Sequence, residues 1–329
     1  MVLTTMMMTK FSVLVPTFKK QFLKECIDSL LAQDYPYFEI IIVNDNSPED
    51  IDGIISKYND NRIKYFTNEQ GFGGKDVVKN WNKCLFLSSG EYVVCMGDDD
   101  MLKPNALSLY AKYIADYPEF KIFHIRTEIV NECNEVIDLQ SPRPLVESMY
   151  SMIWNLWKGR DQFIGDYLFD ANHLKSNGGF FYLPYAWSSD KISTFIASQV
   201  HGIININTIG FCYRRTSLTI SNSCTTQRDR YDALLSEKNW YKKLANSTPE
   251  IDGEDILYFS LIKNNYNKYM NSRLDAMLKW DLHESPTHII YWLKKRKAYG
   301  FSKVYCLKII SCFLNSYKSR FLRIIFHHY

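Results

Sequence analysis

The sequence YVVCMGDDD at Tyr92–Asp100 joins a short apolar run to three consecutive carboxylates. The apolar run Tyr92–Met96 predicts a buried strand, and Asp98–Asp100 follow it after a single glycine. Adjacent carboxylates repel one another, and a solvated turn is one way to keep that cost small. A hard divalent cation is another, because Mg²⁺ and Mn²⁺ are held by carboxylates together with phosphate oxygens. The stretch therefore predicts either an acidic turn or a metal-assisted phosphate site at a strand end.

Apolar runs and amphipathic helix patterns alternate over the first 130 residues. The expected strands are Phe11–Val15, Glu39–Val43, Ile63–Thr67, Tyr92–Met96 and Ile122–Val130. The expected helices are a stretch from Phe22 to Leu31, Ile51–Tyr58, Lys75–Leu87 and one that begins at Pro104. Strands separated by helices predict an α/β fold with a mainly parallel sheet and right-handed crossovers.

Polar residues follow three of these strands at the point where each strand ends. They are Pro16–Phe18, Asn44–Ser47 and Gly97–Asp100. Ligands of parallel sheets bind in the crevice beyond the carboxyl ends of the strands. We therefore expect the three segments to face one crevice.

The alternation breaks down beyond Val130. Helix patterns recur at Glu147–Trp157, Ser188–Gln199, Asp229–Leu244 and Ile256–Leu282, and strand patterns at Ile203–Ile206 and Ile209–Arg214. The second part of the chain is therefore expected to be mostly helical.

Composition excludes several classes of protein. With 46% hydrophobic and 23% charged residues the chain is typical of globular proteins, and a net charge of +3 does not favour nucleic-acid binding. Its eight cysteines form no CxxC pair, which indicates a reducing compartment and therefore the cytoplasm. We expect no signal peptide and no spanning helix, because no run of about twenty apolar residues occurs.

Four motifs in a fixed order carry a family resemblance. They are SVLVPTF at Ser12–Phe18, IIIVNDNS at Ile40–Ser47, KNWNKCLFLSSGEYV at Lys79–Val93 and MGDDDMLKPNAL at Met96–Leu107. Together they resemble glycosyltransferase family 2, the inverting enzymes with the GT-A fold. The resemblance implies a Rossmann-like, mainly parallel sheet flanked by helices, and covers Phe11–Leu107 most strongly.

The resemblance assigns the donor side of a site. It implies that Pro16, Thr17 and Phe18 line the nucleobase and ribose pocket, and that Asp45 accepts a hydrogen bond from the base. The alternative for Asp45 is a residue that closes its own turn. Lys79 stands where the family commonly has arginine, and is either a phosphate contact or a solvated surface lysine.

The acidic triplet departs from the family pattern. Gly97 stands where the first aspartate of the DxD motif usually lies, so the alignment makes Asp99 the metal ligand, supported by Asp98 or Asp100. Asp98 is also assigned to the nucleotide-sugar site. The implied cofactor is Mn²⁺ or Mg²⁺.

The acceptor side is expected from the second half. Resemblance to the second acidic motif makes Asp190 the candidate general base, with a helix N-terminal acid as the alternative. Asp166 and Asp170 are the other candidate bases. Arg214 resembles the family's closing arginine, which would clamp the diphosphate, and Arg215 is its alternative.

We divide the chain into three parts on these grounds. Residues 10–130 form the nucleotide-sugar-binding half of the GT-A domain, 131–225 the acceptor-binding half, and 226–329 a helical C-terminal region. Six lysines, three arginines and no acid lie between Ser285 and Tyr329. A basic amphipathic tail of this kind suits an anionic membrane interface, although packing against the catalytic domain is the alternative.

The function expected from the resemblance is transfer of a hexose or N-acetylhexosamine from a UDP-sugar to a saccharide or lipid-linked acceptor. It would proceed by single displacement with a divalent metal, in bacterial surface-polysaccharide biosynthesis at the inner face of the membrane, without nucleic-acid partners. The alternative is a non-catalytic carbohydrate-binding or assembly subunit that retains the fold. A nicotinamide dehydrogenase lacks support because no GxGxxG follows the first strand, and a nucleotidyltransferase would release pyrophosphate instead of UDP.

Overall fold

The computed structural model describes residues 8–216 and 227–326. The chain divides into two compact units. Within the described residues, the first unit holds 8–216 and 249–262, and the second holds 227–248 and 263–326. The expected boundary at residue 225 falls among residues 217–226, outside the described part of the chain.

One sheet forms the centre of the first unit, with strand order β3-β2-β1-β4-β9-β6-β10-β5. Its strands are β1 (Phe11–Thr17), β2 (Phe38–Asn44), β3 (Ile63–Thr67), β4 (Tyr92–Cys95), β5 (Met101–Leu102), β6 (Ile122–Val130), β9 (Tyr167–Asp170) and β10 (Ile203–Arg214). Strands β1 to β4 pair in parallel, and so do β6 and β10, whereas β9 runs antiparallel between β4 and β6. Two short strands, β7 (Val136–Leu139) and β8 (Val146–Glu147), pair with β6 and β10.

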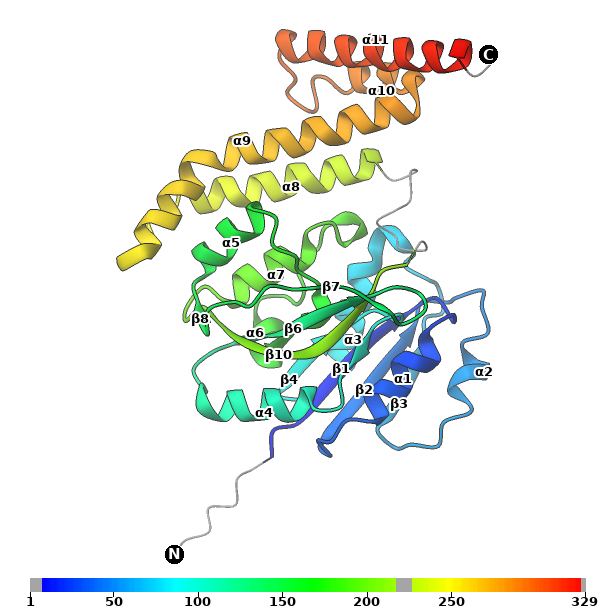
Figure 1. Ribbon diagram of the computed structural model, residues 1–329, viewed down its shortest axis with the longest axis vertical. Coiled ribbons are helices and arrows are strands. Elements are labelled where there is room, and N and C mark those ends of the chain that lie inside the picture. Colours follow the sequence, from blue (N-terminus) through cyan, green and yellow to red (C-terminus); the bar gives the residue numbers. More distant parts are fainter. Residues whose placement is uncertain (1–7, 217–226, 327–329) are drawn as a thin grey trace, which may run out of the picture. The chain divides into compact units, whose positions relative to one another are not determined.

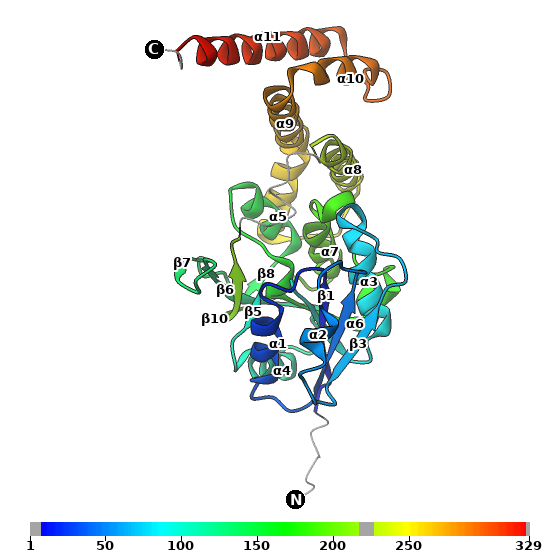
Figure 2. The ribbon, with the colours of Figure 1, turned by 90° about the vertical axis from the view of Figure 1, so that its right-hand side faces the viewer.

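Helices cover both faces of this sheet because both faces are apolar. Alternate residues of β1, Phe11, Val13 and Val15, pack in one core with α1 (Leu23–Leu31) and α4 (Ala106–Asp116). The opposite face packs against α3 (Val77–Leu87). Figure 2 shows α1 and α4 on one side of the strands and α3 on the other. Strands buried on both faces explain the near-continuous apolar runs of the sequence.

The expected strands and helices of the first 130 residues all occur, with shifted ends. The expected helix over residues 51–58 is only one turn, α2 (Asp52–Ile55). The two strands expected near residue 209 are one strand, β10, because an irregularity after Ile206 interrupts the register and not the strand. Strands β5, β8 and β9 were not predicted, since runs of two to four residues carry too little periodicity.

Helices dominate the remainder of both units. The first unit contains α5 (Met149–Trp157), α6 (Ala171–Ser176) and α7 (Ser189–Ala197). The second contains α8 (Gln227–Ala245), most of α9 (Gly253–Glu284), α10 (Ile289–Lys294) and α11 (Lys303–Phe326). Within it, α8 and α9 lie side by side (Figures 1 and 2). Among the described residues, no helix combines the length and apolarity that crossing a bilayer requires.

Candidate functional site

Thr17, the last residue of β1, contacts residues that follow or end β2 and β4. Its carbonyl oxygen accepts a hydrogen bond from the Asp45 amide at 2.9 Å, and its hydroxyl donates to the Asp98 carboxylate at 2.9 Å. Thr17 also pairs in register with Asn44 at the end of β2. Because β2, β1 and β4 are neighbouring parallel strands (Figure 1), Asp45 and Asp98 lie at the same edge of the sheet.

Asp98 fixes the loop that follows β1. One oxygen, Oδ2, accepts hydrogen bonds from the Thr17 hydroxyl at 2.9 Å and from the amides of Phe18 and Lys19, both at 2.8 Å. Burial raises the pKa of Asp98 even though these three hydrogen bonds favour its ionised form. Asp98 therefore holds the segment Pro16–Phe18 in place beside the acidic triplet.

Asp45 is buried and organises the glycine-rich loop. Its carboxylate accepts hydrogen bonds from the Asn68 side chain at 2.8 Å and from the amides of Phe72 at 2.7 Å and Gly73 at 2.8 Å. A Cβ atom at Gly71 would lie 2.4 Å from the Asp45 carbonyl oxygen, so this close approach requires glycine. Asp45 thus binds a loop distant in sequence and is more than a residue closing its own turn.

Arg214 holds the acidic triplet through hydrogen bonds made inside the protein. Its amide donates to Asp100 Oδ1 at 2.9 Å, its Nε to the Asp99 carbonyl at 2.9 Å, and its Nη2 to Glu25 at 2.8 Å. The guanidinium carbon lies 4.2 Å from the Phe22 ring centre, and the side chain is fully buried. Arg214, which we expected to clamp the diphosphate, therefore lies inside the protein, where its ion pair and hydrogen bonds fix the acidic loop.

Asp99 is the member of the triplet whose carboxylate is not used by the fold. Within the described residues it accepts no hydrogen bond from another residue, whereas Asp98 and Asp100 bind β1 and β10. Burial and the neighbouring Asp98 raise the pKa of Asp99 to about 6. Burial and Asp99 likewise raise the pKa of Asp100. A cation beside Asp99 would relieve this cost of burying like charges.

The donor set suits a metal shared with a ligand. In residues 8–216 and 227–326, no group of three or more His, Cys, Asp or Glu side chains is arranged to hold an ion alone. Mg²⁺ is usually held by one or two carboxylates plus substrate phosphates and waters. The free carboxylate of Asp99 fits that requirement.

Lys79 lies in a separate small cluster on α3. Its ammonium is 3.1 Å from the Asp76 carboxylate and 5.8 Å from the centre of the Tyr182 ring. The Tyr182 hydroxyl donates to the same carboxylate. The side chain is half exposed, and within the described residues it forms no hydrogen bond or ion pair with the acidic triplet.

Asp190 occupies the first turn of α7 and is partly exposed. The N-cap is Ser188, so Asp190 is not the capping residue. Tyr185, Ala186 and Ser188 all have positive φ, at 58°, 53° and 71°. Such conformations cost energy in non-glycine residues and cluster at functional sites, so this entry to α7 is a candidate acceptor-side loop.

The other two candidate bases have structural roles. Asp166 is fully buried, and its carboxylate accepts hydrogen bonds from Thr127 at 3.2 Å and Gln140 at 2.7 Å. Asp170 caps α6 through the amide of His173 and pairs with Lys121. Neither position suits a base that must reach an acceptor hydroxyl.

Several residues that support the site were not predicted. Glu25 on α1 and Phe22, which precedes α1, contact Arg214, and the Asn68 side chain donates to Asp45. Each contact joins residues far apart in the sequence, and no local pattern marks such pairs.

Comparisons with known proteins cover the same region. The family model "Glycosyl transferase family 2" matches residues 12–150. The chain is 43% identical over 104 residues to the GalNAc(5)-diNAcBac-PP-undecaprenol beta-1,3-glucosyltransferase of Campylobacter jejuni, covering 31% of this chain and 33% of that protein. It is 37% identical over 102 residues to the putative colanic acid biosynthesis glycosyl transferase WcaA of Escherichia coli, covering 30% and 36%. The chain thus matches about a third of the length of these relatives.

Solved structures show the same fold. TarS residues 1–349 of S. aureus, crystallised with UDP-GlcNAc, match with a TM-score of 0.61 and 17% identity over 94% of this chain and 92% of that chain. The mannosyltransferase PcManGT of Pyrobaculum calidifontis, in complex with GDP-Man and Mn²⁺, matches with a TM-score of 0.51 and 15% identity over 94% and 86%. The expected GT-A-like fold with a helical C-terminal region is confirmed. The family match therefore covers residues 12–150, which contain all four motifs and the acidic triplet.

Proposed function

We propose that the chain is an inverting glycosyltransferase that moves a hexose or N-acetylhexosamine from a UDP-sugar to a saccharide or lipid-linked saccharide. One observation carries the proposal: Thr17 joins the ends of three strands, and Asp99 presents an unused carboxylate there. The sugar nucleotide named in the TarS structure and the undecaprenol-linked substrate named for the C. jejuni relative support these substrate classes.

On the donor side, we assign the nucleobase and ribose to the segment Pro16–Phe18 and the base contact to Asp45. A cation, Mn²⁺ or Mg²⁺, would be held by Asp99 with support from Asp98 or Asp100. It would neutralise the charge that develops on the leaving diphosphate. The Mn²⁺ named with PcManGT is consistent with this choice. We keep Lys79 as a proposed contact of the donor phosphates, and we assign to Arg214 the role of holding the acidic loop.

On the acceptor side, we assign residues 131–225 to acceptor binding and Asp190 to proton removal from the attacking hydroxyl. Single displacement at the anomeric carbon requires such a base. A position in the first turn of α7 also favours a negative charge. The hydroxyl oxygen then forms the new glycosidic bond as the bond to the diphosphate breaks, and UDP leaves with that electron pair.

Release of UDP from a panel of UDP-sugars, with Mn²⁺ or Mg²⁺ and a lipid-linked saccharide acceptor, tests the proposal. General-base catalysis typically contributes about 10²–10⁴-fold, so Asp190→Asn should lower kcat by that range while UDP affinity is retained. Asp170→Asn is the matched control, because Asp170 caps a helix and should leave kcat within about twofold. Absence of both UDP binding and UDP release with every donor would refute the proposal and favour a non-catalytic subunit.

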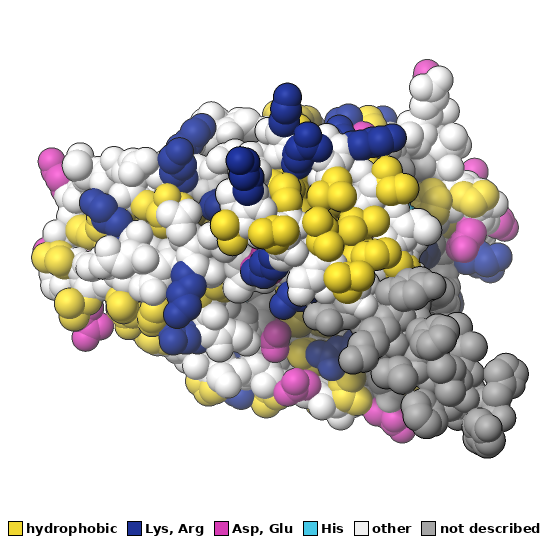
Figure 3. All heavy atoms as spheres, turned by 90° about the horizontal axis from the view of Figure 1, so that it is seen from above, with side chains coloured by type: hydrophobic (Ala, Val, Ile, Leu, Met, Phe, Trp, Pro, Cys, Tyr) yellow, Lys and Arg dark blue, Asp and Glu magenta, His cyan; other side chains and the backbone are white. Residues whose placement is uncertain are grey.

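The second unit supports a further partner, an anionic membrane surface. Helix α11 buries Ile309 completely and exposes Val304, Leu307 and Leu314 on another face. Figure 3 shows exposed apolar side chains gathered on the upper face and flanked by lysines and arginines. An apolar stripe with cationic flanks suits the interface of anionic lipids. This surface supports the proposal that the protein acts in the cytoplasm, peripherally at the inner face of the membrane.

Sedimentation with phosphatidylcholine vesicles, with and without phosphatidylglycerol, tests this partner. Leu307→Glu should abolish sedimentation with the anionic vesicles, because it places a carboxylate in the apolar stripe. Leu257→Glu is the matched control, since Leu257 on α9 is 65% exposed and Leu307 is 66% exposed. Equal sedimentation of the two variants would show that α11 does not mediate membrane binding.

A further inference from the structure

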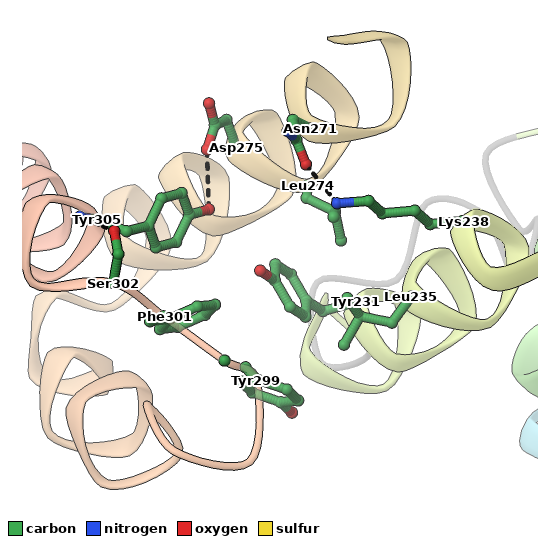
Figure 4. Close-up of a pocket in the computed structure, with 11 residues that line it drawn as sticks. Tyr231, Leu235, Lys238, Asn271, Leu274, Asp275, Tyr299, Phe301, Ser302 and Tyr305 are labelled. Carbon is green, nitrogen blue, oxygen red and sulfur yellow. Dashed lines mark hydrogen bonds between the residues drawn. The ribbon is translucent and has the colours of Figure 1, made fainter. Parts of the chain in front are cut away.

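The second unit contains a pocket with a volume of about 200 Å³. Aromatic rings form much of its wall: Tyr231 lies 5.1 Å from Tyr299 and 6.1 Å from Phe301, and Phe301 lies 4.6 Å from Tyr305, between ring centres. Figure 4 shows Tyr231 coming from α8, with Tyr299 and Phe301 from the segment that precedes α11. Tyr299, Phe301 and Tyr305 are partly exposed, so these three rings can present apolar surface to a ligand, whereas Tyr231 is buried.

Polar groups line another side of the same pocket. Asn271 and Asp275 come from α9 and Lys238 from α8 (Figure 4). The Lys238 ammonium donates to Asn271 Oδ1 at 2.7 Å, and the Tyr305 hydroxyl donates to Asp275 Oδ1 at 2.8 Å. Asn271 Nδ2 donates no hydrogen bond to the described residues, so its two N–H groups are available to a ligand.

The charges in the pocket exclude strongly charged ligands. The Asp275 carboxylate is also paired with Lys308, so it does not present a net negative charge for a metal ion. The single lining ammonium, Lys238, is partly buried, and burial together with Lys242 lowers its pKa. Lys238 is the single cationic side chain that lines the pocket and it already donates to Asn271, so the pocket offers no group of cations for a phosphate. An uncharged ligand rich in hydrogen-bonding groups fits best.

We propose that this pocket binds one sugar ring of a saccharide, separately from the transfer site. The aromatic walls suit the C–H faces of a pyranose, and Asn271, Asp275 and Lys238 suit its hydroxyl groups. The volume is below the roughly 300–1,000 Å³ of pockets that hold drug-sized ligands, which favours one ring over a nucleotide. The inference rests on the proposed function, because a saccharide acceptor would supply the ring and the second unit would anchor it.

Saturation-transfer difference NMR on the full chain tests the pocket. The probes are the methyl glycosides of glucose, galactose, N-acetylglucosamine and N-acetylgalactosamine, with UDP and Mn²⁺ present to fill the donor site. At least one probe should bind, and Asn271→Ala should weaken that binding about fivefold, the loss expected for one hydrogen bond. Asn267→Ala is the matched control, because Asn267 is exposed one turn earlier on α9 and does not line the pocket.

Two results would overturn the inference: no saturation transfer to any of the four probes, or equal weakening by Asn271→Ala and Asn267→Ala. Failure of the proposed function gives a different result, because UDP release from the donor would then be absent in the unaltered protein. Asn271→Ala should leave donor hydrolysis unchanged and raise only the KM for a saccharide acceptor. A variant that lost donor hydrolysis as well would indicate that the pocket has a structural role.

Discussion

The substitution Asp99→Asn should stabilise the metal-free protein while removing its response to metal. Burial and Asp98 raise the pKa of Asp99 to about 6 from its ordinary value of 3.8. A shift of about 2 pKa units corresponds to about 3 kcal/mol, because each unit is worth about 1.4 kcal/mol. Asp99 is partly exposed, and solvent screening reduces this figure. We expect the free energy of unfolding to rise by about 1–3 kcal/mol at pH 7.5.

The sign of the pH dependence follows from the same shift. The folded protein binds the Asp99 proton more tightly than the unfolded chain does, so the cost of ionising Asp99 is present above pH 6. As pH falls from 7.5 through 6 toward 4, this cost disappears and the advantage of Asp99→Asn should disappear with it. The difference between the two proteins reports the ionisation of Asp99 together with its effect on Asp100, because Asp99 also raises the pKa of Asp100.

Urea unfolding in the presence of EDTA, from pH 7.5 to pH 4.5, measures the effect. In a thermal melt, a gain of about 1 kcal/mol in the free energy of unfolding should raise Tm by about 2–4 °C in a unit of this size. Addition of Mn²⁺ and UDP should then stabilise the unaltered protein and not Asp99→Asn. Glu119→Gln, which removes an exposed acid, should change neither measurement. A variant that is less stable at pH 7.5, or that keeps its full Mn²⁺ response, would refute the reasoning.

Two further substitutions test the contacts around the site and the sheet. Asp98→Ala removes the acceptor of the Phe18 and Lys19 amides, so urea unfolding should show a loss of about 1–3 kcal/mol in the free energy of unfolding. Calorimetry should show UDP binding that is at least tenfold weaker, and an unchanged urea midpoint would contradict the assigned role. Burial alone would raise the pKa of Glu39, but hydrogen bonds, the strongest of them from Lys64, outweigh burial and hold the pKa at about 2, below the ordinary value of 4.5. Glu39→Gln should therefore cost up to about 3 kcal/mol at pH 7, a loss that shrinks as pH falls below 4.5, and a difference that stayed constant down to pH 3 would argue against it.

Local pattern in the sequence was sufficient for much of the first unit. The apolar runs of β1 and β2 are long and are followed directly by polar residues, so both the strands and the edge at which their ends meet could be predicted. The acidic triplet could be located for the same reason, because a strand end fixes where the following residues lie.

Only the tertiary structure decided how the three acids differ. Asp98 binds β1, Asp100 binds the end of β10, and Asp99 keeps its carboxylate free of other described residues. These contacts join residues 80 or more positions apart, such as Phe18 with Asp98 and Arg214 with Asp100. Periodicity reports which face of an element is apolar, but it carries no information about which distant side chain completes a hydrogen bond. For that reason the sequence determined the sheet and its acidic edge, and packing of β10 and α1 determined which carboxylate remains available.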